Sequence, residues 1–196
     1  KYILWFYYED NDINNLELEL KSQILLNYIK DPHFTQNLAF KHNVIDEVAR
    51  KEMKRIVEEI ENDKLIKFIK LYRLRSSIKR KISLILRKEF KVKTEFKEIL
   101  KQANNLAIKN NSKLYFVYLP NSARYKLNYN DPNYQSVKKI IDAMNIPFID
   151  IHKEVMEKEK KPLELFPSRI YGHYTGHYTV EGYRKISEKI YQIIEK

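Results

Sequence analysis

Several residue types are missing or scarce in this 196-residue chain, and each shortage narrows the possible functions. There is no cysteine, which excludes disulfides, thiolate metal ligands and a cysteine nucleophile. Three glycines leave little room for a glycine-rich loop that cradles phosphate. No apolar run approaches the roughly 20 residues that a membrane-spanning helix needs. What remains is a composition typical of one globular α/β domain with a local excess of basic residues.

The net charge of +11 is concentrated in one part of the chain. Residues 64–88 contain ten basic residues and no acidic residue, while the rest of the chain is close to balanced. The ten are Lys64, Lys67, Lys70, Arg73, Arg75, Lys79, Arg80, Lys81, Arg87 and Lys88. The charge is therefore a local feature, and composition alone does not predict nucleic-acid binding.

This basic segment alternates Leu, Ile and Phe with Lys and Arg at helical spacing, within a predicted helical insertion over 44–91. Three interpretations stay open. The helices pack their apolar side on the domain, or dock on an anionic membrane surface, or contact an acidic polymer such as nucleic acid or an acidic polysaccharide. No recognised nucleic-acid-binding motif is present, so a nucleic-acid partner is the least favoured.

Short apolar runs alternate with amphipathic segments along the chain, which predicts strands alternating with helices. Strands are predicted over Tyr2–Tyr8, Lys113–Leu119 and Ile146–Ile151. Helices are predicted over Leu16–Tyr28, Val44–Ile60, Thr94–Asn110, Tyr134–Met144 and Val180–Ile194. Thr94 and Thr179 are suitable N-caps, and Phe96, Leu100, Ala103 and Leu106 form the expected inner face of one helix. The predicted fold class is a three-layer α/β/α domain with a parallel sheet.

The strand at Tyr2–Tyr8 is apolar at every position, which is typical of a strand covered on both faces. An unpaired edge of that composition would aggregate, so this strand needs neighbours on both sides. With three strand candidates the sheet looks incomplete, and we expect residues 1–196 to form the C-terminal part of a longer domain. The alternative is a small three-stranded sheet with Tyr2–Tyr8 in its middle.

Each predicted strand leads directly into polar residues. Glu9-Asp10-Asn11-Asp12 follows the first strand, Pro120-Asn121-Ser122 the second, and Asp150 with His152 the third. A further polar segment, SRIYGHYTGHYTVEGYR, precedes the last helix. Ligands of open parallel sheets bind beyond the carboxyl ends of the strands, so these segments are predicted to share one edge.

Two of these segments together resemble the SGNH (GDSL-type) hydrolase superfamily. The run FYYEDNDINNL is similar to the family's Gly-x-Asn-Asp block after a central strand, and GHYTVEGYRKISEKI is similar to its histidine block. KLYFVYLPNSARY and IPFIDIHKEV resemble the family's penultimate strands, particularly in bacterial members related to polysaccharide O-acetyl transfer. The resemblance covers most of the chain except the basic helical region, and it implies an SGNH/flavodoxin-like α/β/α fold.

The resemblance also implies roles for three residues. Asn11 matches the asparagine whose side-chain amide helps to form an oxyanion hole. Asp12 matches the neighbouring aspartate, which we interpret as structural. His177 matches the catalytic histidine, which takes the proton of a serine hydroxyl and returns it to the leaving group. The alternative for Asn11 and Asp12 is a turn into the following helix, and the alternative for His177 is an ordinary surface histidine.

The chain departs from the family pattern at three places. The nucleophilic serine block and the glycine block are both absent from the sequence, and Tyr174 occupies the position of the acid that orients the histidine. Three explanations remain open: a Ser-His dyad, orientation of the imidazole by another acid such as Asp150, or a degenerate site. His173, in the duplicated GHYT, lacks the tail that follows His177; the two histidines together lack a third metal ligand at suitable spacing.

The resemblance therefore implies a serine esterase or O-acyltransferase that acts on an acyl ester or an acetylated carbohydrate and needs no cofactor or metal. The chain as given would lack the nucleophile and be inactive or nearly so. The alternative is a non-catalytic module on the same scaffold that holds an anionic partner through the basic helices.

Overall fold

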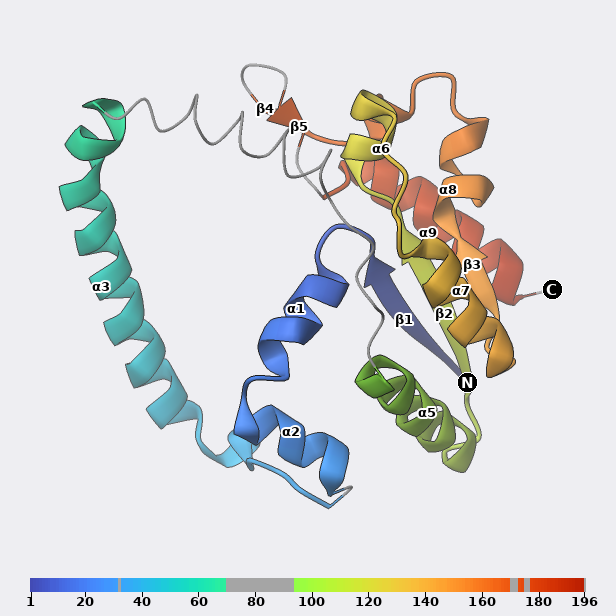
Figure 1. Ribbon diagram of the computed structural model, residues 1–196, viewed down its shortest axis with the longest axis horizontal. Helices are drawn as coiled ribbons and strands as arrows, with labels where there is room; N and C mark the ends of the chain where they lie inside the picture. The colour runs from blue at the N-terminus through green and yellow to red at the C-terminus, as the bar shows by residue number, and fades with distance from the viewer. Residues whose placement is uncertain (32, 70–93, 170–172, 175–176, 196) are drawn as a thin grey trace. The chain divides into compact units, whose positions relative to one another are not determined.

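The computed structural model describes residues 1–31, 33–69, 94–169, 173–174 and 177–195 (Figure 1). The chain divides into two compact units. The first comprises Lys1–Gln23 and Lys88–Lys196, and the second comprises Ile24–Arg87. The insertion predicted over 44–91 overlaps the second unit.

The first unit contains a parallel three-stranded sheet with the order β1-β2-β3. Its strands are β1 (Tyr2–Tyr8), β2 (Lys113–Leu119) and β3 (Phe148–Asp150). β1 pairs along its whole length with β2, from Tyr2 opposite Lys113 to Tyr8 opposite Leu119. The α/β class and the parallel sheet are therefore confirmed, and β2 is the central strand.

Two apolar clusters lie on the two faces of this sheet. Alternate residues of β2 point to opposite faces, so Phe116 belongs to one cluster and Val117 to the other. Helices α5 (Thr94–Lys109) and α7 (Tyr134–Ala143) supply the first cluster. Helices α8 (Ile151–Glu154) and α9 (Val180–Ile194) supply the second. This layering explains why β2 is apolar at almost every position.

β1 differs from β2 because it lies at the edge of the described sheet. Tyr7 is buried, but Tyr2 and Phe6 are each 50% exposed and Ile3 is 41% exposed. The expectation that this strand is covered on both faces is wrong for the described residues, as is the alternative that places it in the middle of the sheet. The apolar composition of β1 indicates that the strand is suited to burial, but burial also requires other helices or strands that pack against it.

Several helices differ from their predicted form. The segment Leu16–Tyr28 is not one helix but parts of two, α1 (Asp12–Glu19) and α2 (Gln23–Lys30). On α5, Leu106 is 62% exposed and Ala107 is buried instead, so the inner face turns by one residue. The strand predicted over Ile146–Ile151 is shorter in the structure, because α8 begins at Ile151. Besides α8, the unpredicted elements of the first unit include α6 (Ser122–Leu127), η2 (Met156–Lys158), η3 (Pro162–Leu165) and the antiparallel pair β4 (Ser168–Arg169) and β5 (His173–Tyr174).

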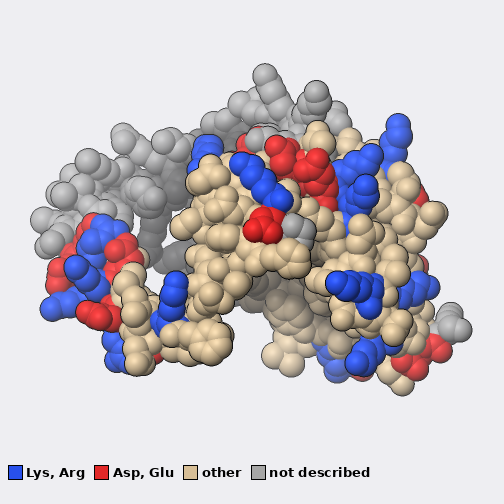
Figure 2. Space-filling model, turned by 90° about the horizontal axis from the view of Figure 1, so that it is seen from below, with Lys and Arg blue, Asp and Glu red and all other residues tan. Residues whose placement is uncertain are grey.

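The second unit contains part of α2, the short helix η1 (Leu38–Phe40) and the long helix α3 (His42–Ile69). The helix predicted over Val44–Ile60 lies within α3. Basic and acidic side chains lie side by side on α3 (at left in Figure 2), where Arg55 forms ion pairs with Glu52 and Glu59. Residues 70–88 of the basic segment lie outside the described residues. No helix in the described ranges combines the length and apolarity needed to cross a bilayer.

Asparagine forms the left-handed turns in the described part of the chain. Asn37, Asn111, Asn128 and Asn145 have φ values from 49° to 55°. Asn111 precedes β2 and Asn145 precedes β3, so these turns set where two of the three parallel strands begin. A short amide side chain tolerates this conformation better than most residues do.

Candidate functional site

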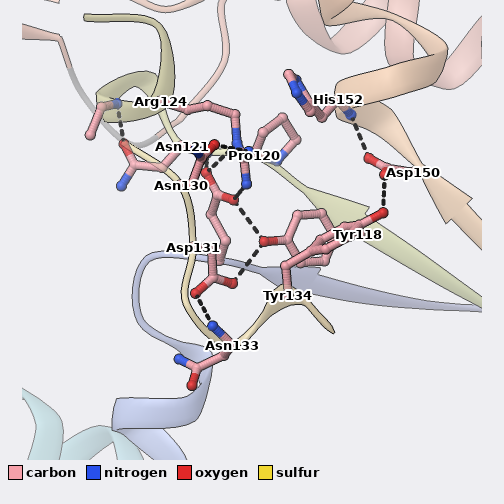
Figure 3. A network of polar contacts seen from close by, with 12 residues as sticks. Tyr118, Pro120, Asn121, Arg124, Asn130, Asp131, Asn133, Tyr134, Asp150 and His152 are labelled. Atoms are coloured by element: carbon pink, nitrogen blue, oxygen red, sulfur yellow. Dashed lines mark hydrogen bonds and ion pairs between the residues drawn. The ribbon is translucent and has the colours of Figure 1, made fainter. Parts of the chain in front are cut away.

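The polar residues that follow the three strands meet at one edge of the sheet, as the strand-end rule predicts (Figure 3). Glu9 follows β1, Asn121 follows β2, and Asp150 ends β3. Glu9 and Asn121 are joined by a hydrogen bond, and a tyrosine on α7 reaches Asp150. The edge thus carries two polar networks, one around Glu9 and one around Asp150, with apolar clusters on both faces of the sheet.

Glu9 is the centre of the first network. Its side chain has 0% exposure, yet each of its oxygens accepts hydrogen bonds. Oε1 accepts from the backbone N–H of Asn121 at 2.6 Å, and Oε2 accepts from the Tyr118 hydroxyl at 2.7 Å. Arg124 completes the set with a 2.6 Å ion pair from Nη2 to Oε2. Donors from β2, from the loop after it and from α6 therefore converge on one carboxylate from the end of β1.

Burial raises the pKa of the Glu9 carboxyl, and Arg124, the Asn121 amide and the Tyr118 hydroxyl oppose that shift. Burial alone would lower the pKa of Arg124, but its hydrogen bonds and charge attraction to Glu9 outweigh burial and raise it. Glu9 and Arg124 therefore form a hydrogen-bonded pair whose side chains are both largely removed from water. Arg124 also donates to Asn130 at 3.2 Å, which fixes the direction of the guanidinium.

The Tyr118 hydroxyl lies between two buried carboxyl groups. It is 2.7 Å from Oε2 of Glu9 and 2.7 Å from Oδ2 of Asp131. The other oxygen of Asp131 accepts the backbone N–H of Asn133 at 3.0 Å, which holds the turn before α7. Burial and the two neighbouring acids raise the pKa of Tyr118, so the phenol keeps its proton and serves as a structural bridge.

Asp150 is used to cap α8. Its Oδ1 accepts from the backbone N–H of His152 at 3.0 Å, and its Oδ2 accepts from the Tyr134 hydroxyl at 2.6 Å. Both oxygens therefore hold local structure at the end of β3. This geometry supplies no contact through which Asp150 would orient His177.

His152 was expected at this edge from its place after β3 but was assigned no role, and in the structure it contacts two neighbouring side chains. Its Nδ1 is 2.9 Å from the Tyr125 hydroxyl, and its Nε2 is 3.1 Å from Glu157. Burial, followed by the positive charge of Arg124, lowers the pKa of His152. The neutral imidazole then donates from Nε2 to Glu157 and accepts from Tyr125. The one signal in the sequence was a histidine two residues after a strand-ending aspartate.

Three residues that follow His177 have structural roles: Tyr178, Thr179 and Gly182. Tyr178 is buried, and its hydroxyl donates to the carbonyl oxygen of Pro120 at 2.6 Å, directly beyond β2. Thr179 caps α9 by accepting from the N–H of Gly182 at 3.0 Å. A Cβ at Gly182 would lie 2.6 Å from the carbonyl oxygen of Leu165, so only glycine fits. The exposed His177 is therefore attached to a segment that is tied to the end of the central strand.

Asn11 and Asp12 behave differently from each other. Oδ2 of Asp12 accepts the backbone N–H of Tyr8 at 2.9 Å and so closes the turn after β1. Burial raises the pKa of Asp12, and the hydrogen bond from Tyr8 opposes that shift. Asn11 is exposed, and its side chain makes no cap hydrogen bond to α1. The turn interpretation therefore accounts for Asp12, whereas the amide of Asn11 has no part in capping the helix.

His173 and Tyr174 form β5, whose backbone pairs with β4, and their side chains lie outside the described part of the structure. Within the described residues, no three His, Asp or Glu side chains come together as a metal site would require. Comparison of the chain with protein families, with curated proteins and with solved structures found no match.

Proposed function

We propose that this chain is part of an SGNH-type α/β hydrolase domain that acts as a serine esterase or O-acyltransferase. The observation that carries the proposal is the hydrogen bond from Tyr178 to the Pro120 carbonyl. It ties the histidine block to the end of β2, next to the strand end from which Asn11 follows. Asn11 and His177 lie 166 positions apart in the sequence, and their segments thus belong to adjacent strand ends.

The proposed chemistry gives each residue one role. His177 accepts the proton of a serine hydroxyl as its oxygen attacks the acyl carbon, and the Asn11 amide donates to the resulting oxyanion. The C–O bond to the leaving group breaks, and that group takes the proton from His177. Water or an acceptor hydroxyl then attacks the acyl-serine, which gives hydrolysis or transfer respectively. Removing one such oxyanion donor typically slows turnover about a hundred- to a thousandfold.

β1 is an edge strand of the described sheet, which is consistent with a serine supplied by a further strand. Within the described residues β1 pairs only with β2, and Tyr2, Ile3 and Phe6 are each at least 41% exposed. Another parallel strand beside β1 would pair with its backbone and end beside Asn11, and the layers that cover that strand would also reduce the exposure of these side chains. In the proposed domain this strand carries the nucleophile. The substrates that fit this chemistry are acyl esters, including acetylated carbohydrates.

A fluorophosphonate probe tests the proposal in the full-length protein. We expect the probe to label one serine, and we expect H177A to abolish labelling and short-chain ester hydrolysis. N11A should slow hydrolysis about a hundred- to a thousandfold. The matched control is H173A, which changes the other histidine of the duplicated GHYT and should keep most activity. Undiminished hydrolysis in H177A would end the assignment.

Two observations favour a second candidate, a non-catalytic binding module on the same scaffold. Tyr174 replaces the acid that would orient His177, and both oxygens of Asp150 are engaged in capping α8 and binding Tyr134. This candidate predicts that the full-length protein neither reacts with the probe nor hydrolyses esters. The same experiment therefore separates the two functions.

A further inference from the structure

A hydroxyl, an imidazole and a carboxylate are joined in series beyond the ends of β2 and β3. The Tyr125 hydroxyl of α6 lies 2.9 Å from Nδ1 of His152, which belongs to α8. Nε2 of the same imidazole lies 3.1 Å from Oε1 of Glu157 in η2. We refer to these three residues as the Tyr–His–Glu triad. The chemistry proposed above for His177 and Asn11 uses none of them.

The hydroxyl and the imidazole of the triad are held in place by contacts within the first unit. The backbone N–H of His152 donates to Asp150 at 3.0 Å, which fixes the first turn of α8 at the end of β3 (Figure 3). The ring of Tyr125 packs with its centre 5.8 Å from that of Phe166 and 5.7 Å from that of the imidazole. The side chains of His152 and Glu157 are 20% and 54% exposed, so the triad reaches the protein surface.

The protonation states of the triad suit a hydroxyl that passes its proton to a base. Burial and the positive charge of Arg124 lower the pKa of His152, so the imidazole is neutral at neutral pH and accepts at Nδ1. Burial, followed by the charge of Glu9, raises the pKa of Tyr125, so the phenol keeps its proton until a base removes it. Arg124 opposes that shift and therefore favours negative charge on the phenol oxygen. A hydroxyl bonded to a base that a third group orients is the arrangement of an activated nucleophile.

The charges around the Tyr125 hydroxyl indicate which class of electrophile fits the triad. The carboxylates of Glu9, Asp150 and Glu157 all disfavour negative charge at this hydroxyl. Arg124 acts in the opposite sense, but its guanidinium is ion-paired with Glu9. Transfer of a phosphoryl group needs cations that offset the charge of its oxygens, so these surroundings disfavour it. The carbonyl group of an acyl donor carries no net charge and is compatible with them.

We propose that Tyr125 is a nucleophile that takes up an acyl group from a donor with a good leaving group, such as a thioester or an aryl ester. The phenol oxygen attacks the acyl carbon while its proton moves to Nδ1 of His152, and the carboxylate of Glu157 stabilises the resulting imidazolium. The bond between the acyl carbon and the leaving group breaks, and the leaving group takes the proton from His152. The product is an acyl-tyrosine, an aryl ester that can pass the acyl group to an acceptor hydroxyl. This step requires no serine, so it goes beyond the function proposed above.

Acetylation by p-nitrophenyl acetate tests this proposal in the full-length protein, with the acetyl group located by peptide mass spectrometry. We expect Tyr125 to be acetylated about a hundred- to ten-thousandfold faster than Tyr183, a half-exposed tyrosine of α9 that serves as an internal control. H152Q should lower the rate at Tyr125 by the same factor. Acetylation of Tyr125 no faster than that of Tyr183, or as fast in H152Q as in the unchanged protein, would overturn the proposal. The location of the acetyl group separates this result from labelling of the proposed serine.

The pH dependence of acetylation gives a second test, because the imidazole of His152 accepts the phenol proton only in its neutral form. Burial and the charges of Arg124 and Lys153 lower the pKa of His152. The charges of Glu157 and Asp150 act in the opposite direction and raise it. The rate of acetylation should therefore decline as the pH falls through the pKa of the folded protein, which lies below the usual value of about 6.5.

E157Q tests the triad without removing its base. The imidazole of His152 loses a neighbouring charge that favours its protonated form, so the midpoint of the pH dependence should move to lower pH. A general loss of stability would not move this midpoint in that direction. The matched control is E164Q, which changes an exposed glutamate of η3 and should leave the midpoint where it is in the unchanged protein. The same midpoint in E157Q and E164Q would contradict the proposed triad.

Discussion

The guanidinium of Arg124 lies 2.6 Å from the carboxylate of Glu9, although 115 positions of the chain separate the two residues. Glu9 follows β1 and Arg124 belongs to α6, which begins just after β2. Both side chains are largely removed from water, with exposures of 0% and 11%. The ion pair therefore fixes the relative position of the two strand ends from which Asn11 and the Pro120 carbonyl follow.

Breaking this pair on one side is expected to destabilise the first unit strongly. E9Q leaves the guanidinium of Arg124 buried without its counter-charge, which typically costs about 3–5 kcal/mol. The measurement is the free energy of unfolding in urea at neutral pH. E164Q removes the exposed ion pair with Lys161 and serves as the control, with an expected change below about 1 kcal/mol. Similar losses for both variants would contradict the importance of the buried pair.

The neutral form of His152 predicts a loss of stability in mild acid. Burial and the charge of Arg124 lower the pKa of His152 in the folded protein below its usual value of about 6.5. As the pH falls below about 6.5, the His152 imidazole becomes protonated in the unfolded chain but stays neutral in the folded protein, so folding becomes less favourable. The loss continues until the pH reaches the lowered folded-state pKa.

This pH effect can be measured by comparing unfolding free energies of the unchanged protein and H152Q between pH 7 and pH 5, an interval set around about 6.5. The variant lacks the titrating ring, so its stability should depend less on pH in this interval. H33Q, which changes a histidine in an exposed turn, should retain the original dependence. An identical slope for H152Q and the unchanged protein would remove His152 as the cause.

Replacing Gly182 by alanine, which adds one methyl group, is expected to destabilise the first unit. Alanine normally favours an α-helix over glycine by about 1 kcal/mol. At this position the new Cβ would lie 2.6 Å from the Leu165 carbonyl oxygen and 3.0 Å from Cβ of Tyr178. The backbone around Leu165 or Tyr178 must shift, so we expect G182A to lower the free energy of unfolding by about 1–3 kcal/mol. S187A, on the exposed face of the same helix, should show no such loss in thermal unfolding.

Tyr178 is expected to contribute through its hydroxyl as well as its ring. Y178F keeps the packing against Phe166, whose ring centre is 4.9 Å away, but leaves the Pro120 carbonyl without this donor. The expected loss is about 1–3 kcal/mol of unfolding free energy. Y183F changes the neighbouring, half-exposed tyrosine of α9 and is the control. If the loss in Y178F does not exceed that in Y183F, the hydrogen bond does not hold the histidine block.

Local sequence patterns predicted the regular elements of the first unit well, because apolar spacing is a property of neighbouring residues. Lys113–Leu119 and Val180–Ile194 have the predicted bounds, and Thr179 caps α9 as predicted. The exposure of β1 could not be predicted in this way, since its residues are as apolar as those of β2. Burial depends on which strands and helices lie alongside, and local spacing does not contain that information.

The candidate site was predicted in outline and missed in detail for the same reason. Polar residues after the parallel strands were expected at one edge of the sheet, where the structure has them, and the Asx pattern after β1 allowed for the turn that Asp12 closes. Some contacts join side chains from different elements at no regular separation in the sequence. These are the contacts of Glu9 with Arg124 and of His152 with Tyr125 and Glu157. A single sequence gives no signal for contacts of this kind.

The left-handed asparagines have a practical consequence for anyone who alters this protein. At Asn111 and Asn145, glycine is the substitute that tolerates the same backbone, whereas a β-branched residue would strain it by about 1–2 kcal/mol or more. Each of these turns lies just ahead of a strand, so we expect such strain to disturb the register in which that strand pairs with its neighbour. A mutagenesis library should therefore allow only asparagine, aspartate and glycine at these two positions.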